Sequence, residues 1–179
     1  MSIDLKKNIK ALRKGNQLAG FQLYQHFAKA TYNTILRIVP QSDIASDLLQ
    51  ESFIQAFEKI DKLENEQAFG GWIKRIAINR SLEHLRKQKQ FPLSLEEIND
   101  FDAREEEVEI PELAFGTIQS AINELPAGCR IIFQLFYLEE YSHAEIANEL
   151  NTSISNSKTQ LRYAKQLLQE KLKMVYETR

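Results

Sequence analysis

Apolar residues recur at intervals of three and four through the first half of the chain, and no stretch alternates long enough to indicate a strand. The pattern predicts an all-α fold. A first long helix runs to Val39, where Pro40 ends it; a second follows Ser42; a third begins near Phe69 and runs to Leu85. The residues expected on the apolar stripe of the first helix are Leu18, Phe21, Ala28, Tyr32, Ile35 and Val39.

The second half predicts two helices, over residues 113–125 and 127–138, and then a helix-turn-helix. Ser142 and Glu145 have the spacing of a capping box, which gives the third helix of this half a defined start. That helix should end near Leu150, where Asn151 can adopt the left-handed conformation, and Ser153 can cap a fourth helix from about Ile154. The apolar face expected on that helix is Ile154, Leu161, Ala164 and Leu168.

The remaining faces of that last helix are polar and basic. Lys158, Arg162 and Lys165 share one shoulder of the helix. The side opposite the apolar stripe is expected to carry Asn156, Thr159, Gln160 and Tyr163. A helix in the major groove would offer such groups to base edges, although an ordinary amphipathic helix pair also has a polar outer face.

The net charge of −2 conceals a division along the chain. Residues 1–90 carry fifteen Lys and Arg against nine Asp and Glu, whereas residues 91–125 carry ten acids against Arg104 alone. We therefore expect two small helical domains, residues 1–90 and 112–179, joined by a flexible acidic linker over residues 91–111.

The third predicted helix has more positive charge than packing requires. Against Glu83 alone, residues 71–90 carry six basic residues: Lys74, Arg75, Arg80, Arg86, Lys87 and Lys89. Phe69 and Trp72 stand beside them. Cations next to aromatic rings suit a nucleic acid with unstacked bases, but the spacing of the two aromatic residues also suits the core.

Several classes of chemistry find no support in the sequence. The single Cys129 excludes an internal disulfide and a cysteine zinc cluster, and His26, His84 and His143 lack ligand spacing, so we expect no metal and no cofactor. The sequence shows no catalytic nucleophile paired with a general base and no glycine-rich phosphate loop, so it gives no indication of an enzyme. Without a signal peptide or a run of about twenty apolar residues, we expect a cytoplasmic protein.

Two motifs together resemble a known family. DLLQESFIQAFEKIDKLENEQAFGGWIKRIAINRSLEHLRKQK resembles region two of bacterial extracytoplasmic-function (ECF) sigma factors, and residues 125–172 resemble their region four. The likeness covers about three-quarters of the chain, in the right order. It implies a non-enzymatic protein that directs core RNA polymerase to specific promoters and helps open the minus-ten element.

The resemblance also implies roles for residues of the first domain. Binding to the clamp coiled coil of core polymerase carries over to Asp47, Leu48, Gln50, Glu51, Phe53, Gln55 and Phe57. Core packing competes for Leu48, Phe53 and Phe57. Contact with the minus-ten element carries over to Phe69, Trp72, Lys74, Arg75, Asn79 and Arg80. We expect the loop Glu64–Ala68 to set much of the sequence preference.

In the second domain, the resemblance places the last helix in the major groove of the minus-thirty-five element. The candidate contacts are Ser155, Asn156, Lys158, Thr159, Gln160, Arg162, Tyr163 and Lys165. The frequent family pattern G-T-V-K-S-R is replaced by residues 155–160, so Gln160 stands where arginine is usual and Ser157 where valine is usual. Gln160 would favour adenine, and the Ser157 hydroxyl would bond to a carbonyl one turn back.

The sequence leaves other readings open. A conventional helix-turn-helix regulator would account for the second half but not for the basic and aromatic segment of the first. A helical adaptor would account for the apolar stripes alone. Within the family reading, an anti-sigma factor is a further partner class, and the free protein is expected to be a monomer without membrane insertion.

Overall fold

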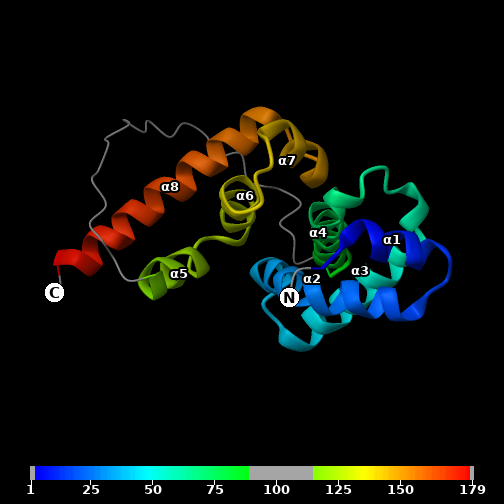
Figure 1. Cartoon of the computed structure of the whole chain (residues 1–179). Coiled ribbons are helices and arrows are strands. Elements are labelled where there is room, and N and C mark those ends of the chain that lie inside the picture. The colour runs from blue at the N-terminus through cyan, green and yellow to red at the C-terminus, as the bar shows by residue number, and fades with distance from the viewer. Residues whose placement is uncertain (1–2, 89–114, 178–179) are drawn as a thin grey trace. The chain divides into compact units, whose positions relative to one another are not determined.

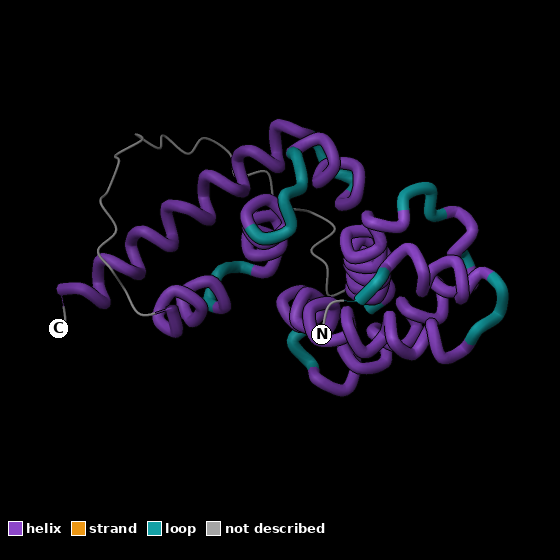
Figure 2. Tube along the Cα trace, in the orientation of Figure 1, coloured by secondary structure: helices purple, strands orange, loops and turns teal. Residues whose placement is uncertain are grey.

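The computed structural model describes residues 3–88 and 115–177, and every regular element within these ranges is a helix (Figures 1 and 2). The all-α prediction is confirmed. The chain divides into two compact units after Gln88. The expected linker, residues 91–111, lies outside the described residues.

The first unit is built around α2. Its described elements are α1 (Leu5–Arg13), α2 (Gln17–Ile38), α3 (Ser42–Glu58), the 3-10 turns η1 (Ile60–Lys62) and η2 (Glu66–Ala68), and α4 (Phe69–Lys87). Helices α2, α3 and α4 pack on one another, while α1 packs on α2 and on both 3-10 turns. Leu23, Ile35, Ile73 and Leu82 lie fully buried between them.

Helix α1 is an element that the sequence analysis does not predict. Asp4 caps it by accepting a hydrogen bond from the backbone N–H of Lys7 at 3.0 Å. Ile9 is fully buried, and its neighbours four before and three after, Leu5 and Leu12, are half-buried. The spacing of these three residues is the signal that could have revealed the helix.

The buried face of α2 differs from the predicted stripe at its start. Leu18 and Phe21 are 64% and 54% exposed, whereas Ala19 and Leu23 point inward. The cause is α1, which comes so close that a Cβ on Gly20 would lie 3.2 Å from Cδ1 of Leu12. Gly20 therefore lies on the side of α2 that α1 covers, and Leu18 and Phe21 lie away from the core.

The second unit consists of four helices in its described part: α5 (Phe115–Asn123), α6 (Ala127–Tyr137), α7 (His143–Leu150) and α8 (Ile154–Glu177). Helix α8 packs on the other three. A core where α5 and α6 meet α8 contains Ala121, Ile122, Leu125, Cys129, Ala164, Leu168 and Leu172.

The helix-turn-helix is confirmed in detail. Ser142 and Glu145 form the capping box, and Asn151 ends α7 in the left-handed conformation with φ 51° and ψ 51°. Ser153 then accepts a hydrogen bond from the backbone N–H of Asn156 at 3.0 Å and so caps α8. Ile154, expected on the apolar face, is instead 47% exposed, because it lies in the first turn of α8, ahead of the packed region.

Two adjacent glycines at the start of α4 make a matched stability test. A Cβ at Gly71 would meet nothing within 4 Å, whereas one at Gly70 would lie 2.9 Å from Cε1 of Phe27. Gly71→Ala should raise the free energy of unfolding by about 0.5–1 kcal/mol, because alanine loses less backbone entropy than glycine in a helix. Gly70→Ala should gain less or lose stability, since the Phe27 ring must move. Chemical denaturation of the two variants beside the wild type checks this, and an equal gain from both would contradict it.

Two negative findings apply to residues 3–88 and 115–177. No helix there is long and apolar enough to cross a membrane. Nor do three or more His, Cys, Asp or Glu side chains gather there in a way that could hold a metal ion.

Candidate nucleic-acid interface

One face of α4 is exposed to solvent along most of the helix. It carries Arg75, Asn79, Glu83 and Arg86 at intervals of four, four and three. Lys87 pairs with Glu83 at 2.8 Å, and this contact contributes to lowering the pKa of the Glu83 carboxyl. Of the predicted minus-ten residues, Arg75 and Asn79 therefore lie on a surface that a nucleic acid can reach, with Lys74 half-buried beside them.

The two aromatic candidates on α4 differ in exposure. Phe69 is fully buried, with its ring centroid 5.3 Å from that of Phe27 and 6.0 Å from that of Trp72. Stacking of Phe69 on a base is incompatible with this position, since no part of the ring is accessible. The core alternative holds for Phe69, and Trp72, which is half-buried, is the aromatic side chain that remains available.

Arg80 joins α4 to α3. Its Nε donates to Oε1 of Gln55 at 3.1 Å, and its Nη1 lies 3.1 Å from Oε2 of Glu51. A predicted minus-ten residue and two predicted polymerase-binding residues thus form one partly exposed cluster. Because exposed ion pairs contribute little to stability, these contacts can be exchanged for others on binding.

The polymerase-binding candidates on α3 separate into two groups. Asp47, Gln50 and Glu51 are exposed. Leu48 and Phe53 are buried in the core, and Phe57 is half-buried with its ring centroid 5.7 Å from that of Phe53. The competing core assignment therefore accounts for Leu48 and Phe53, while the three exposed residues remain available to a partner.

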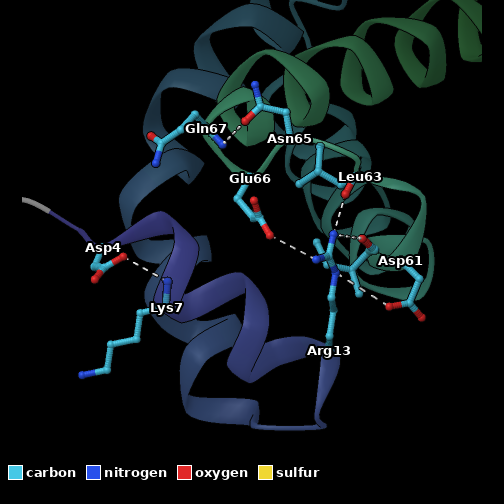
Figure 3. Close-up of polar contacts among 9 residues, drawn as sticks. Asp4, Lys7, Arg13, Asp61, Leu63, Asn65, Glu66 and Gln67 are labelled. Carbon is cyan, nitrogen blue, oxygen red and sulfur yellow. Dashed lines mark hydrogen bonds and ion pairs between the residues drawn. The ribbon is translucent and has the colours of Figure 1, made fainter.

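Arg13, at the end of α1, holds the segment before α4 (Figure 3). Its Nη2 donates to the carbonyl oxygens of Leu63 and, at 3.4 Å, of Ile60. Its Nη1 lies 3.2 Å from Oε1 of Glu66, and its Nε lies 3.8 Å from Oδ1 of Asp61. Sequence analysis missed this residue, because no helix was expected at Leu5–Arg13 to present it.

The exposed stripe of α8 is formed by Ser155, Lys158, Arg162 and Lys165, at intervals of three, four and three. Asn156 and Thr159 border it and are half-buried. Asn156 donates from Nδ2 to Thr152 Oγ1 at 2.8 Å, and Thr159 donates from Oγ1 to the carbonyl of Ser155 at 3.1 Å. The accessible face of α8 is therefore more basic than predicted.

Gln160 does not lie on the outer face, and that prediction is wrong. The residue is 4% exposed and accepts a hydrogen bond at Oε1 from the thiol of Cys129, with Sγ 2.8 Å away. Burial raises the pKa of the Cys129 thiol to about 11, so the thiol stays protonated and can donate. Tyr163 also turns inward and packs, partly buried, against the core of the second unit.

The position of Gln160 follows from helical spacing. The buried stripe of α8 is formed by Ser157, Leu161, Ala164 and Leu168. Gln160 lies three residues after Ser157 and four residues before Ala164, which places it on the same face of the helix. A residue with these neighbours points toward the core. This spacing is the sequence signal that places Gln160 in the core, and its polar residue type is the reason why it was expected on the side opposite the apolar stripe.

Ser157 joins the two helices of the helix-turn-helix. Its buried hydroxyl lies 2.9 Å from Nδ1 of His143, which differs from the expected bond to a carbonyl one turn back. The His143 ring also stacks on Phe136, with centroids 4.7 Å apart. Desolvation, and secondly the positive charge of Lys158, lower the pKa of His143 below its ordinary value.

This environment predicts a pH dependence for the second unit. Because the folded pKa of His143 lies below the unfolded value of about 6.5, the unfolded chain binds the proton more tightly. The free energy of unfolding of the second unit should be highest above the unfolded pKa of about 6.5 and should decrease as the pH falls from there toward the folded pKa. His143→Gln should reduce the loss of unfolding free energy between about pH 7.5 and 5.5. Amide hydrogen exchange in peptides from residues 127–168 measures this free energy at each pH. An unchanged loss in the variant would show that other groups cause it.

Comparison with protein families gives matches to both units. Residues 23–91 match the sigma-70 region 2 model, and residues 115–168 match the sigma-70 region 4 model. Across its length the chain is similar to the ECF RNA polymerase sigma factor SigW of Bacillus subtilis, with 30% identity over 186 residues, covering 97% of this chain and 99% of SigW. It is also 28% identical to the ECF sigma factor SigM of the same organism over 153 residues, covering 82% of this chain and 91% of SigM.

Two solved structures share the fold. The sigma factor RpoE of Bartonella quintana, crystallised with the anti-sigma factor NepR, has a TM-score of 0.55 at 22% identity and covers 85% of this chain and 95% of its own. CnrH in complex with the cytosolic domain of CnrY has a TM-score of 0.54 at 20% identity and covers 93% of this chain and 96% of its own.

Proposed function

The chain belongs to the ECF sigma factors of the sigma-70 family, and we propose how its two units divide the work of promoter recognition. ECF sigma factors direct transcription initiation by RNA polymerase and are not enzymes. In the proposal, the first unit binds core polymerase and the minus-ten element, and the second unit binds the minus-thirty-five element.

The observation that carries the proposal is a pair of solvent-facing, cationic helix surfaces, one on each unit. On α4 the surface includes Arg75 and Asn79, and on α8 it includes Lys158, Arg162 and Lys165. Cations of this kind position a protein on phosphates, while amide side chains read base edges. A net charge of −2 makes strong binding to duplex DNA by the free chain unfavourable, so polymerase is expected to deliver it to the promoter.

At the minus-ten element, we assign phosphate contacts to Lys74 and Arg75 and a base contact to Asn79. Arg80 joins them if its contacts with Glu51 and Gln55 exchange on binding. Trp72 is the candidate for stacking on an unpaired base, and the loop Glu64–Ala68 is the candidate for the pocket that selects it. Capturing a base must offset a few kcal/mol of unstacking, which favours a pocket that is well formed in advance.

At the minus-thirty-five element, the exposed stripe of α8 would lie along the major groove. Lys158, Arg162 and Lys165 are assigned to phosphates, and Ser155, Asn156 and Thr159 to base edges. Gln160 is excluded from this set by its burial, and Tyr163 contributes at most its accessible edge.

The proposed surface for the clamp coiled coil of core polymerase is the exposed side of α3, with Asp47, Gln50 and Glu51 and with Gln55 at its edge. A cytoplasmic monomer in the free state completes the proposal. An anti-sigma factor is a second proposed partner, since RpoE of Bartonella quintana was crystallised with one.

Run-off transcription tests the assignment. Purified core polymerase from the source bacterium is incubated with promoter fragments, with and without this protein. Asn79→Ala should reduce the preference for the natural minus-ten sequence, whereas Glu83→Ala, on the same exposed face, serves as the control and should leave the preference unchanged. New transcripts with equal preference in wild type and Asn79→Ala would overturn the role of Asn79. No promoter-dependent transcripts, together with no co-elution with core polymerase, would overturn the proposed function.

A further inference from the structure

The segment between α3 and α4 lacks regular structure from Leu63 to Asn65, yet it is held at both ends. Its backbone N–H at Leu63 donates to the carbonyl of Ile60 at 3.2 Å, which closes η1. Asn65 accepts from the backbone N–H of Gln67 at 3.0 Å and so caps η2 (Figure 3). Neither contact fixes the segment to another helix.

Arg13 ties this segment to α1 through polar contacts, in addition to the packing of α1 on η1 and η2. It lies 47 to 53 residues away in sequence from its partners Ile60, Leu63 and Glu66. Its side chain is 26% exposed and that of Glu66 is 21% exposed, so the pair is partly shielded from water. The pKa of the Glu66 carboxyl is lowered, first by a backbone hydrogen bond at Glu66 itself and further by the charge of Arg13.

A guanidinium group is suited to this position. It is planar, always charged and has five N–H donors in a fixed arrangement, so one side chain can serve two carbonyl oxygens and a carboxylate together. Lysine has a single nitrogen and cannot reach all three acceptors in the same geometry. Without Arg13, the carbonyl oxygens of Ile60 and Leu63 would exchange their donor for water, and the segment would gain conformational freedom.

We propose that Arg13 is a positioning residue for promoter selection: it holds the loop Glu64–Ala68 in the shape that accepts an unpaired base. This inference rests on the proposed function, which assigns base selection to that loop. Helix α1 then acts as a brace. It can act without contacting DNA, because a loop that is already ordered loses less conformational entropy when a base enters.

The test compares Arg13→Met, which keeps the length of the side chain but removes every donor, with Lys14→Met, which removes the same charge from the next, exposed residue. The main readout is the ratio of run-off transcript from the natural minus-ten element to that from single-base variants of it. Co-elution with core polymerase and hydrogen exchange in peptides from residues 59–68 are measured on the same full-length proteins.

Arg13→Met should lower the selectivity ratio by about two- to ten-fold, the range expected when one additional side chain must be ordered on binding. It should speed exchange in residues 59–68 and leave co-elution with core polymerase unchanged. Arg13→Lys should give an intermediate ratio, and Lys14→Met the wild-type ratio. A wild-type ratio in Arg13→Met would overturn the inference while the proposed function stands.

Two further outcomes are decisive. If Arg13→Met fails to fold, Arg13→Lys decides: an intermediate ratio supports the inference, and a wild-type ratio overturns it. If the wild-type protein gives no promoter-dependent transcripts, the proposed function fails, and the positioning role fails with it.

Discussion

Gln160→Arg is expected to destabilise the second unit by about 2–4 kcal/mol, because it places a positive charge at a buried position, where Gln160 is only 4% exposed. The substitution also removes the acceptor of the Cys129 thiol. Arginine is the residue that the family pattern would favour at this position on sequence grounds alone. The expected result is therefore a loss of stability and not a switch from adenine to guanine.

The measurement is hydrogen exchange in peptides from residues 127–168, together with thermal unfolding of the full-length chain. Ser155→Arg is the matched control, since it adds the same side chain at an exposed position of the same helix. If Gln160→Arg were as stable as Ser155→Arg and changed the preferred base in the minus-thirty-five element, the side chain would have to reach DNA, and its buried position would not be the functional one.

Phe69→Ala should cost the first unit about 3–5 kcal/mol, the usual penalty for removing a fully buried phenylalanine. Phe69 fills the space between Phe27 and Trp72 at the start of α4. Such a loss is a large fraction of the stability of a small domain. Chemical denaturation of the full-length protein, with hydrogen exchange in peptides from residues 19–85, measures it.

Phe69→Leu separates packing from base stacking. Leucine keeps part of the buried apolar volume and leaves a smaller cavity than alanine, so this variant should lose less stability than Phe69→Ala and should still support promoter opening. Permanganate reactivity of unpaired thymines in the minus-ten element reports opening. Normal stability combined with lost opening in Phe69→Leu would revive a direct role for the ring in holding a base.

Helix positions and ends were accessible from the sequence because their causes are local. Pro40 and Pro126 stop helices by geometry, and the capping box at Ser142 and the left-handed Asn151 depend on residues within one turn. The same holds for the helix-turn-helix as a whole. Among the candidate site residues, the charges Asp47, Arg75 and Lys158 are exposed, as their residue type favours.

The errors concern which side of a helix its neighbours cover. Leu18 and Phe21 were assigned to the apolar stripe, but Ala19 and Gly20 are the buried residues at the start of α2, with Gly20 close to Leu12 of α1. Gln160 looks polar by residue type, yet its partner Cys129 lies 31 residues earlier in the chain, on another helix. Arg13 meets partners about fifty residues away. The covered side of α2 and the partners of Arg13 depend on tertiary contacts, which a residue's own neighbourhood in the sequence does not specify. The burial of Gln160, by contrast, follows from its spacing to Ser157 and Ala164.

The acceptors of Arg13 have a consequence for how such a protein can diverge. Two of them, at Ile60 and Leu63, are backbone carbonyl groups, which every amino acid supplies. Substitutions at residues 64, 65, 67 and 68 therefore leave these two bonds intact. A recognition loop that is anchored through its main chain can change its sequence without losing that anchor, much as antibody loops vary on a constant framework. Laboratory libraries at those positions should therefore yield a high fraction of folded proteins.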